Sequence, residues 1–597
     1  MADKILTRAE IPDKYKWNLT HIYPSDEAWQ KDYDAVCAEI PAFAAYDGKV
    51  AKDPRAAIRA YFTLMEKFMP IYEYAFLRKE TDNADPVAQG LKDKASRMYV
   101  QGMTVASFLQ PELLAMDESV LKDMITDPEM KDYDAYLRDL LRQKAHTLSK
   151  DQEKLVAMTG EVMGSPNNIF TALTTADMKL PPVIMPDGTE AELTEGNYSI
   201  FIHSSDRDVR RQAFHNLMTT YGSFGNTIAG TYGASVKKDQ FMADAYNHPS
   251  AVEASLYNNE IPLAVYDNLV SVIHEYIPVL QDYLRLRKSL LNLDELHLYD
   301  LYCPMVAGYE MDLPYDKAFD LVLEGLKPMG EDYLAKLREA RDGGWIDVFP
   351  SVGKSSGAFS SGGLAKVHPY VLLNHNNNLN CAFTIAHELG HSMHSFYSNS
   401  NQPFPKADYT LFVAEVASTC NEAIMMRHLL KTFPEKDAQA YLLNHFLEQF
   451  RTTCFRQTMF AEFERISHDM AQKGIPLTKQ SLSDAYFDLN RTYYGETCFM
   501  DEEIANEWMR IPHFYRAFYV YVYATGLCAA VSISERILNE GESAVQDYRK
   551  FLSAGSSLPP IEALKLAGID MSSPEPLRKA MEVFKETVKK MHEVTGV

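Results

Sequence analysis

The 597-residue chain lacks the features that would mark it for export, for a membrane or for nucleic acid. Residues 1–29 are charged and contain no apolar core of a secretory signal, and no run of about 18 apolar residues follows. The seven cysteines are scattered without a CxxC pair, as is typical of reduced, mostly buried thiols. The net charge is -23, and Lys and Arg form no block. We therefore expect a cytoplasmic protein without nucleic-acid or membrane partners.

Glycine and proline are modest in number, at 28 and 29, so most of the chain can form regular structure. Residues 26–43 and 91–116 carry apolar side chains at helical spacing. In 181–194, Pro-Asp-Gly between two short extended runs predicts a hairpin. A new helix is expected after 204–206, where Ser or Asp can cap it. The sequence thus predicts an all-α fold with minor β structure.

The chain is too long for one ordinary core, so we expect two or more lobes. We place a soft boundary near residue 200, with an N-terminal helical domain over 1–200 and a second domain over 201–597. Within the second domain, residues 351–380 are rich in Gly, Ser and Asn and surround one strand-like run, 369–374. This segment is interpreted as the wall of a site, and a plain connector is the alternative.

The stretch "CAFTIAHELGHSMHSFYS" follows at 381–398 and contains the pattern H-E-x-x-H, formed by His387, Glu388 and His391. Residues i and i+4 of a helix lie one above the other, so both imidazoles can reach one metal ion. Glu388, turned by about 100° on the helix, can hold a water on that ion. A polar helix face rich in histidine is the alternative interpretation, which the pentapeptide alone leaves open.

His394 shares the helix face with His387 but lies about 10.5 Å further along, too far for both to bind one ion. We expect it to support a ligand from behind, to face substrate or to lie at the surface. A third ligand must therefore come from another element.

The next expected helix spans residues 409–430, and Glu415 lies there among apolar residues. A lone carboxylate is costly to bury in that setting unless it is paired or binds a metal. We assign Glu415 as the third ligand and expect Glu422, two turns on, to hydrogen-bond a ligating histidine. The alternative exchanges these two roles. Asp408 is a weaker candidate because aspartate at a helix start simply caps it.

Two imidazoles and one carboxylate leave one coordination position open, as in catalytic rather than structural zinc sites. Zinc would lower the pKa of a bound water, and Glu388 would take its proton and pass it to a leaving amine. We therefore predict one Zn2+ per chain and the hydrolysis of an amide, most naturally a peptide bond.

The stretches "TIAHELGHSMHS" and "FVAEVASTCNE" resemble the oligoendopeptidase F branch of the thimet-oligopeptidase-like zinc peptidases. Further similar stretches lie at 16–29, 204–214, 299–305 and 501–527. The resemblance implies two helical lobes enclosing a deep channel, with zinc at its bottom and short unstructured peptides cut internally. It implies His387, His391 and Glu415 as zinc ligands, Glu388 as the catalytic glutamate, and 201–597 as the metallopeptidase domain.

The family also has a late histidine and tyrosines that bind substrate and stabilise the oxyanion, and His513 matches the histidine. Tyr515, Tyr519 and Tyr523 form one helical stripe, whereas Tyr521 matches better by position. We predict Tyr519 and Tyr521 in this role, and an aromatic core is the alternative for at least two of the four tyrosines.

The segment before the metal motif departs from the family pattern. It reads "NHNNNLN" at 374–380, with His375 added, so side-chain preference is left open. Two other functions are considered. One is a zinc carboxypeptidase or dipeptidyl carboxypeptidase of a related helical fold, and the other is a non-catalytic helical protein that binds peptides.

Overall fold

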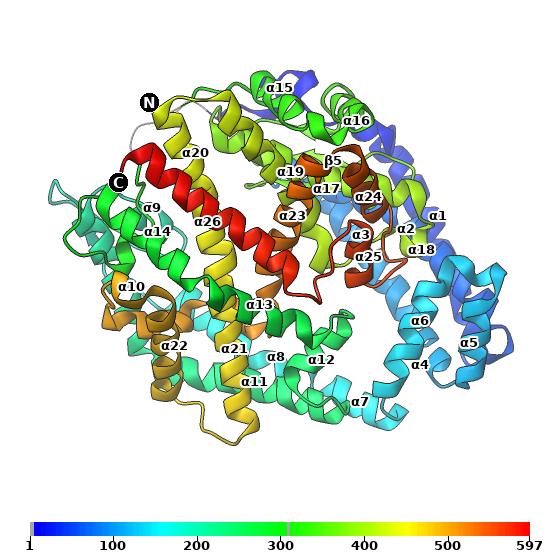
Figure 1. Ribbon diagram of the computed structural model, residues 1–597. Coiled ribbons are helices and arrows are strands. Elements are labelled where there is room, and N and C mark those ends of the chain that lie inside the picture. Colours follow the sequence, from blue (N-terminus) through cyan, green and yellow to red (C-terminus); the bar gives the residue numbers. More distant parts are fainter. Residues whose placement is uncertain (1–4, 307–310) are drawn as a thin grey trace. The chain divides into compact units, whose positions relative to one another are not determined.

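The computed structural model describes residues 5–306 and 311–597, which are mostly helical (Figure 1). Within these residues the helices and five short strands form two compact units, each assembled from three segments. The first unit comprises Met1–Thr147, Glu310–Leu429 and Ile533–Ile569, and the second comprises Leu148–Tyr309, Leu430–Ser532 and Asp570–Val597. The predicted helical fold with minor β structure is confirmed. The channel and the domain boundary near residue 200 stay predictions.

The first unit combines a helical N-terminal segment with a middle segment that adds a small sheet. Its N-terminal helices are α1 Asp26–Glu39, α2 Pro54–Thr81, α3 Pro86–Ala106, α4 Leu109–Leu114, α5 Glu118–Thr126 and α6 Asp134–Gln143. Its later elements are α15 Tyr315–Gly325, α16 Glu331–Asp342, β3 Ile346–Asp347, β4 Phe359–Ser361, β5 Tyr370–Leu372, α17 Leu379–Asn401, α18 Phe404–Ala407, α19 Leu411–Thr432, α24 Glu542–Leu552 and α25 Pro560–Leu566. Helix α23 Tyr521–Glu540 is shared between the units, and the last residues of α19 belong to the second.

The small sheet of the first unit lies just before α17 in the chain and packs against it. Strand β5 lies in the middle, parallel to β3 and antiparallel to β4, and confirms the strand expected within 369–374. All of β5 is buried, and its Tyr370 and Leu372 pack with Trp17 and Leu77. Helix α17 starts a few residues later and packs on β4 and β5. The sheet therefore supports the helix that carries the metal motif, and Ser360 of β4 shares a hydrogen bond with Ser392 of α17.

Side-chain caps fix the starts of key helices. At the start of α17 the side chain of Asn378 accepts a hydrogen bond from the backbone N–H of Cys381, at 3.0 Å. At the start of α10, the side chain of Asp206 accepts from the backbone N–H groups of Asp208 and Val209. The helix expected after 204–206 is thus confirmed, with Asp206 as its cap.

The second unit is a helical assembly with one hairpin. Its elements are α7 Lys150–Met158, α8 Gly160–Ala172, β1 Val183–Ile184, β2 Glu190–Ala191, α9 Tyr198–Ile202, α10 Arg207–Ser223, α11 Gly225–Ala245, α12 Ala251–Asn258, α13 Leu263–Glu275, α14 Ile277–Leu290, α20 Lys436–Gln449, α21 Arg456–Gln472, α22 Lys479–Tyr494 and α26 Glu575–Thr595. Strands β1 and β2 pair antiparallel, which confirms the hairpin predicted at 181–194.

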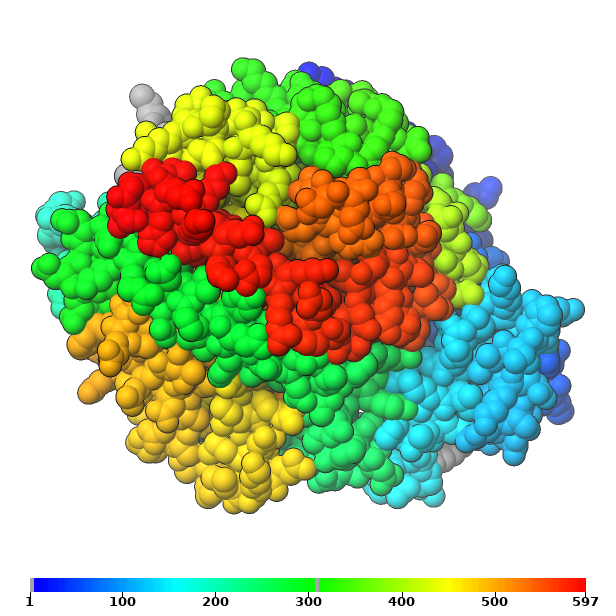
Figure 2. Space-filling view, in the orientation of Figure 1, coloured from blue at the N-terminus to red at the C-terminus, as the bar shows by residue number. Residues whose placement is uncertain are grey.

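Helix α26 shows how remote segments meet within the second unit. It packs along α14 and α20 (Figure 1), and in the space-filling view the red C-terminal residues lie against green and yellow ones (Figure 2). In the part of the chain that the structure describes, no helix combines the length and apolar character needed to span a membrane.

Candidate metal centre

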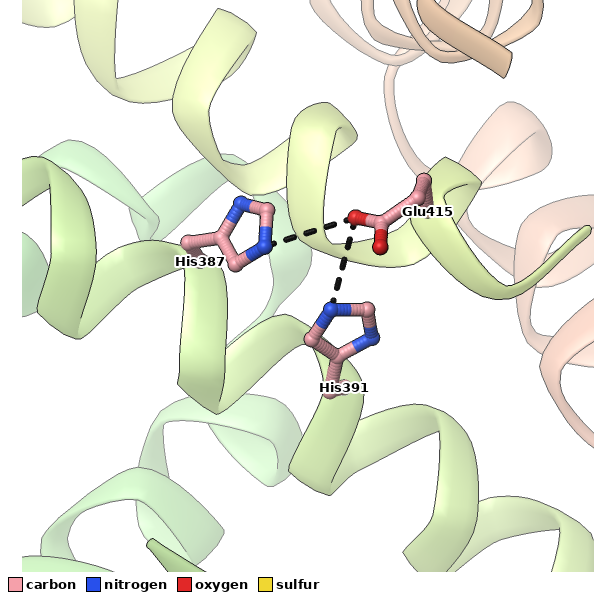
Figure 3. A group of neighbouring side chains, drawn as sticks. All are labelled: His387, His391 and Glu415. Carbon is pink, nitrogen blue, oxygen red and sulfur yellow. Dashed lines mark ion pairs between the residues drawn. The ribbon is translucent and has the colours of Figure 1, made fainter. Parts of the chain in front are cut away.

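Three side chains from two helices of the first unit point toward one another (Figure 3). His387 and His391 lie on α17, and Glu415 lies on α19. The Nε2 atoms of both histidines lie 3.4 Å from Oε2 of Glu415. Two ligands about 2.1 Å from one tetrahedral ion are separated by about 3.4 Å, so the three atoms fit a shared zinc ion. Their donor set, two imidazole nitrogens and one carboxylate oxygen, also suits that metal.

Glu422 lies behind His387 and fixes which ring nitrogen faces the cluster. Its Oε1 lies 2.5 Å from Nδ1 of His387, so Nδ1–H donates and Nε2 is left to bind. Burial lowers the pKa of His387, but the hydrogen bond to Glu422 and the neighbouring carboxylates overcome this and raise it to about 9. Glu422 therefore hydrogen-bonds His387, and its part in supporting a zinc ligand stays a prediction.

Glu415 is held ionised and oriented. Its partial burial raises the pKa of the carboxyl, but the hydrogen bond and charge of His391, with His387 and Ser418, lower it to about 2. The Ser418 hydroxyl lies 3.0 Å from Oε2 of Glu415 and donates to it. A carboxylate that is ionised and aimed at two imidazoles is ready to bind a cation.

Helices α17 and α19 approach so closely because Gly390 has no side chain. A Cβ atom at this position would lie 2.6 Å from the carbonyl oxygen of Ala417 and 2.6 Å from Cα of Ser418. Asn421 of α19 ties the two helices together by donating to the carbonyl of Ala386 at 3.0 Å. The Asn421 side chain also accepts from Tyr333 of α16, so it is fully buried yet paired.

Glu388 lies on α17 between the two histidines and is 6% exposed. Burial raises its pKa above the ordinary range, although His387 and His391 counteract this. A raised pKa brings a carboxylate closer to the value that suits a general base near neutral pH.

His394 is a core side chain, which excludes two of the three positions expected for it. It is 1% exposed and its ring stacks on Tyr409 at 3.6 Å, with Phe551 at 5.2 Å on α24. The expected surface or substrate-facing position is wrong, because the helix face one turn beyond His391 is covered by these rings. Burial lowers the pKa of His394 to about 3, so it is a neutral core side chain. Asp408 lies outside the ligand cluster and its side chain accepts from the backbone N–H of Tyr409.

A second group of predicted residues lies in the second unit, within and after the short 3-10 turn Pro512–Tyr515. His513 is exposed, and its ring is parallel to that of Tyr519 with centroids 6.4 Å apart. Tyr523 completes the group at 5.4 Å from Tyr519, and the Arg516 guanidinium lies 4.1 Å above the Tyr519 ring. Partial desolvation and then the charge of Arg516 lower the pKa of His513.

Tyr521 and Tyr515 face away from this group. Tyr521 is 2% exposed and its ring packs on Tyr266, 5.3 Å away. Tyr515 stacks on Phe170 at 4.6 Å and shares a hydrogen bond with Thr231. Tyr521 is the first residue of α23, and its side chain points into the core. This burial argues against the predicted contact with substrate.

Comparisons with known proteins agree with the metal motif. The family model described as Peptidase family M3 matches residues 200–583, and the one described as Oligopeptidase F matches residues 112–179. The chain belongs to peptidase family M3. It is therefore a metallopeptidase, and the Oligopeptidase F match makes it a metallo-oligopeptidase. The predictions of an enzyme and of an oligoendopeptidase F-like family are confirmed.

Relatives of this M3 peptidase are similar over nearly its whole length. Oligopeptidase PepF of Bacillus subtilis is 44% identical over 99% of this chain and 89% of its own. The crystal structure of a Chlamydophila abortus protein has a TM-score of 0.94 at 31% identity and covers 99% of this chain and 100% of its own. Oligoendopeptidase-F from Enterococcus faecium has a TM-score of 0.73 at 35% identity, covering 96% and 99% respectively.

Sequence reasoning missed several residues that shape the site of this M3 peptidase. Asn421 and Gly390 were not singled out, although an amide within the apolar run of α19 is a signal for a buried hydrogen bond. Arg516 was also missed, and Tyr523 was seen only as part of a stripe. No helical periodicity marks Arg516, because 512–520 is not an α-helix.

Proposed function

We propose that the chain is a zinc-dependent endopeptidase that hydrolyses internal bonds of short, unstructured peptides. The observation that carries this proposal is the cluster of His387, His391 and Glu415, whose ligand atoms all lie within 4.8 Å of one another. We propose one zinc ion per chain, since two imidazoles and one carboxylate leave a position open for catalysis. Internal cleavage is supported by the similarity to the Enterococcus faecium oligoendopeptidase-F.

Each side chain of the metal centre has a separate task in this proposal. Zinc, when bound, lowers the pKa of a coordinated water and polarises a carbonyl group. Glu388 takes a proton from the attacking water and delivers it to the leaving amine. Glu422 holds the proton of His387 on Nδ1, which keeps Nε2 directed at the cluster.

His513 and Tyr519 are proposed to donate hydrogen bonds to the substrate and to the oxygen that becomes negative in the transition state. Their support is the resemblance together with their exposure side by side in one group. Tyr523 belongs to the same group and is the better second tyrosine, because Tyr521 is buried.

The domain division and the cellular location are also proposed from the sequence. An N-terminal region over 1–200 precedes the metallopeptidase domain over 201–597, and the two family models match on either side of that boundary. A cytoplasmic location without nucleic-acid or membrane partners is proposed from the acidic net charge of -23.

A peptide blocked at both ends tests the proposal. We expect cleavage between a fluorophore and a quencher in an acetylated, amidated peptide, together with about one zinc per chain by mass spectrometry of the metal. Removal of zinc by a chelator should abolish cleavage, and added zinc should restore it. Cleavage that requires a free C-terminal carboxylate would instead support the carboxypeptidase alternative, and an active protein without metal would overturn the proposal.

A further inference from the structure

Helix α21 of the second unit carries a buried glutamate, Glu464, that has no role in the proposed mechanism. Glu464 is fully buried, and its Oε2 atom has no hydrogen-bond partner among the described residues. No described Lys or Arg pairs with it, and burial raises its pKa well above the ordinary range. Buried carboxyl oxygens without a partner are rare because they cost free energy, so Oε2 of Glu464 calls for a physical explanation.

The other oxygen of Glu464 holds the segment that leads to Tyr519. Its Oε1 accepts the backbone N–H of Phe518 at 3.0 Å. Phe518 has φ of 55°, a left-handed conformation that a bulky residue adopts only when its surroundings impose it. Its ring is 3% exposed and packs on His468 of the same helix.

The left-handed turn at Phe518 decides which side chains reach the surface. Phe518 and Val520 are both buried, at 3% and 1% exposure, whereas Tyr519 between them is only partly buried. Tyr519 thereby lies beside His513 and under Arg516. A relaxed backbone at Phe518 would rotate the next residue away from that position.

We propose that Glu464 is a positioning residue that holds Phe518 in its left-handed turn and thereby presents Tyr519 beside His513. The inference rests on the role of Tyr519 under the proposed function. Glu464 touches neither substrate nor metal in this account, and it acts only through the backbone of Phe518.

Glu464→Met tests the inference, since it keeps the side-chain volume and removes the acceptor. We expect kcat for a blocked quenched peptide to fall by at least about tenfold, because a displacement of about 1 Å can cost a hundredfold. Glu464→Gln keeps an acceptor for Phe518 and should restore kcat to within about threefold of the wild type. KM should change little in both variants. If the Met variant does not fold, Glu464→Asp replaces it, since its shorter side chain cannot reach Phe518 with the same geometry.

Ser467→Ala is the matched control for a purely structural effect. Ser467 lies on the same helix, is fully buried and shares a hydrogen bond with Tyr232, so its loss should lower the melting temperature but not kcat. An equal loss of kcat in the Gln variant, or a wild-type kcat in the folded Met variant, would overturn the inference.

A double-mutant cycle with Tyr519→Phe separates this inference from the proposed function. If Glu464 acts through Tyr519, the Met substitution should cost much less kcat in the Tyr519→Phe background than in the wild type. Full additivity would show that Glu464 does not act through Tyr519. If Tyr519→Phe alone keeps wild-type kcat, the proposed role of Tyr519 fails, and this inference fails with it. The zinc site is unaffected by either result.

Discussion

The metal cluster and the His513 group are held by different kinds of backbone. His387, His391 and Glu415 lie on two α-helices that touch at Gly390, and Asn421 links these helices through a buried hydrogen bond. His513 and its neighbours lie in a 3-10 turn and a loop with a left-handed residue. Spacing on α17 places the two histidines and the close contact with α19 brings Glu415 to them, whereas the loop depends on individual contacts from behind. Substitutions should therefore affect the two groups in distinguishable ways.

The largest effect is expected from removing a metal ligand. His391→Ala or Glu415→Ala should abolish zinc binding and reduce cleavage toward the uncatalysed rate, a loss of at least about 10⁶-fold. The measurement combines metal content with initial rates on a quenched peptide. Stoichiometric zinc and full activity in either variant would remove that residue from the ligand set.

The His513 group should affect the rate but not the metal. Tyr519→Phe removes one hydroxyl donor and is expected to lower kcat by about 10²-fold while zinc content stays at the wild-type level. Tyr521→Phe is the matched control, because Tyr521 is 2% exposed and should change kcat by less than about threefold. The reverse ranking of the two variants would restore Tyr521 as the substrate contact.

Gly390→Ala tests whether helix contact places the ligands. Its methyl group would lie 2.6 Å from backbone atoms of α19, so the helices must separate and kcat/KM should fall by about 10²-fold. Gly230→Ala on α11 is the control, since its Cβ would meet nothing within 4 Å. A crystal structure of an active Gly390→Ala protein with unmoved helices would contradict this explanation.

The smallest effect is expected from Glu422, which does not bind the metal itself but hydrogen-bonds His387. Glu422→Gln weakens the acceptor for Nδ1–H of His387, so zinc affinity should fall by about 10-fold to 100-fold while the protein stays folded. Competition with a chelator of known affinity measures the change. Glu324→Gln, an exposed carboxylate paired with Lys327, is the control and should leave zinc affinity unchanged. An unchanged affinity for both would assign Glu422 no part in holding the histidine.

The difference between the two groups also explains how far sequence reasoning reached. His387 and His391 could be predicted because i and i+4 meet on any helix, and Glu415 because a lone carboxylate stood in an apolar run. The positions of the tyrosines were predicted on the assumption of one continuous helix. That assumption fails for Tyr515 and Tyr519, because α23 begins only at Tyr521. His394 was misplaced because Tyr409 and Phe551, remote in sequence, cover its helix face. Positions set by spacing within one helix could be predicted from the sequence, whereas contacts between distant segments could not.

The central claim is that Glu388 moves the proton at a zinc centre held by His387, His391 and Glu415. The most direct measurement is the cleavage rate of purified Glu388→Gln, with zinc content determined on the same sample. We predict about one zinc per chain and a rate at least about 10²-fold to 10⁴-fold below the wild type. Wild-type cleavage by a zinc-loaded Glu388→Gln protein would contradict the claim.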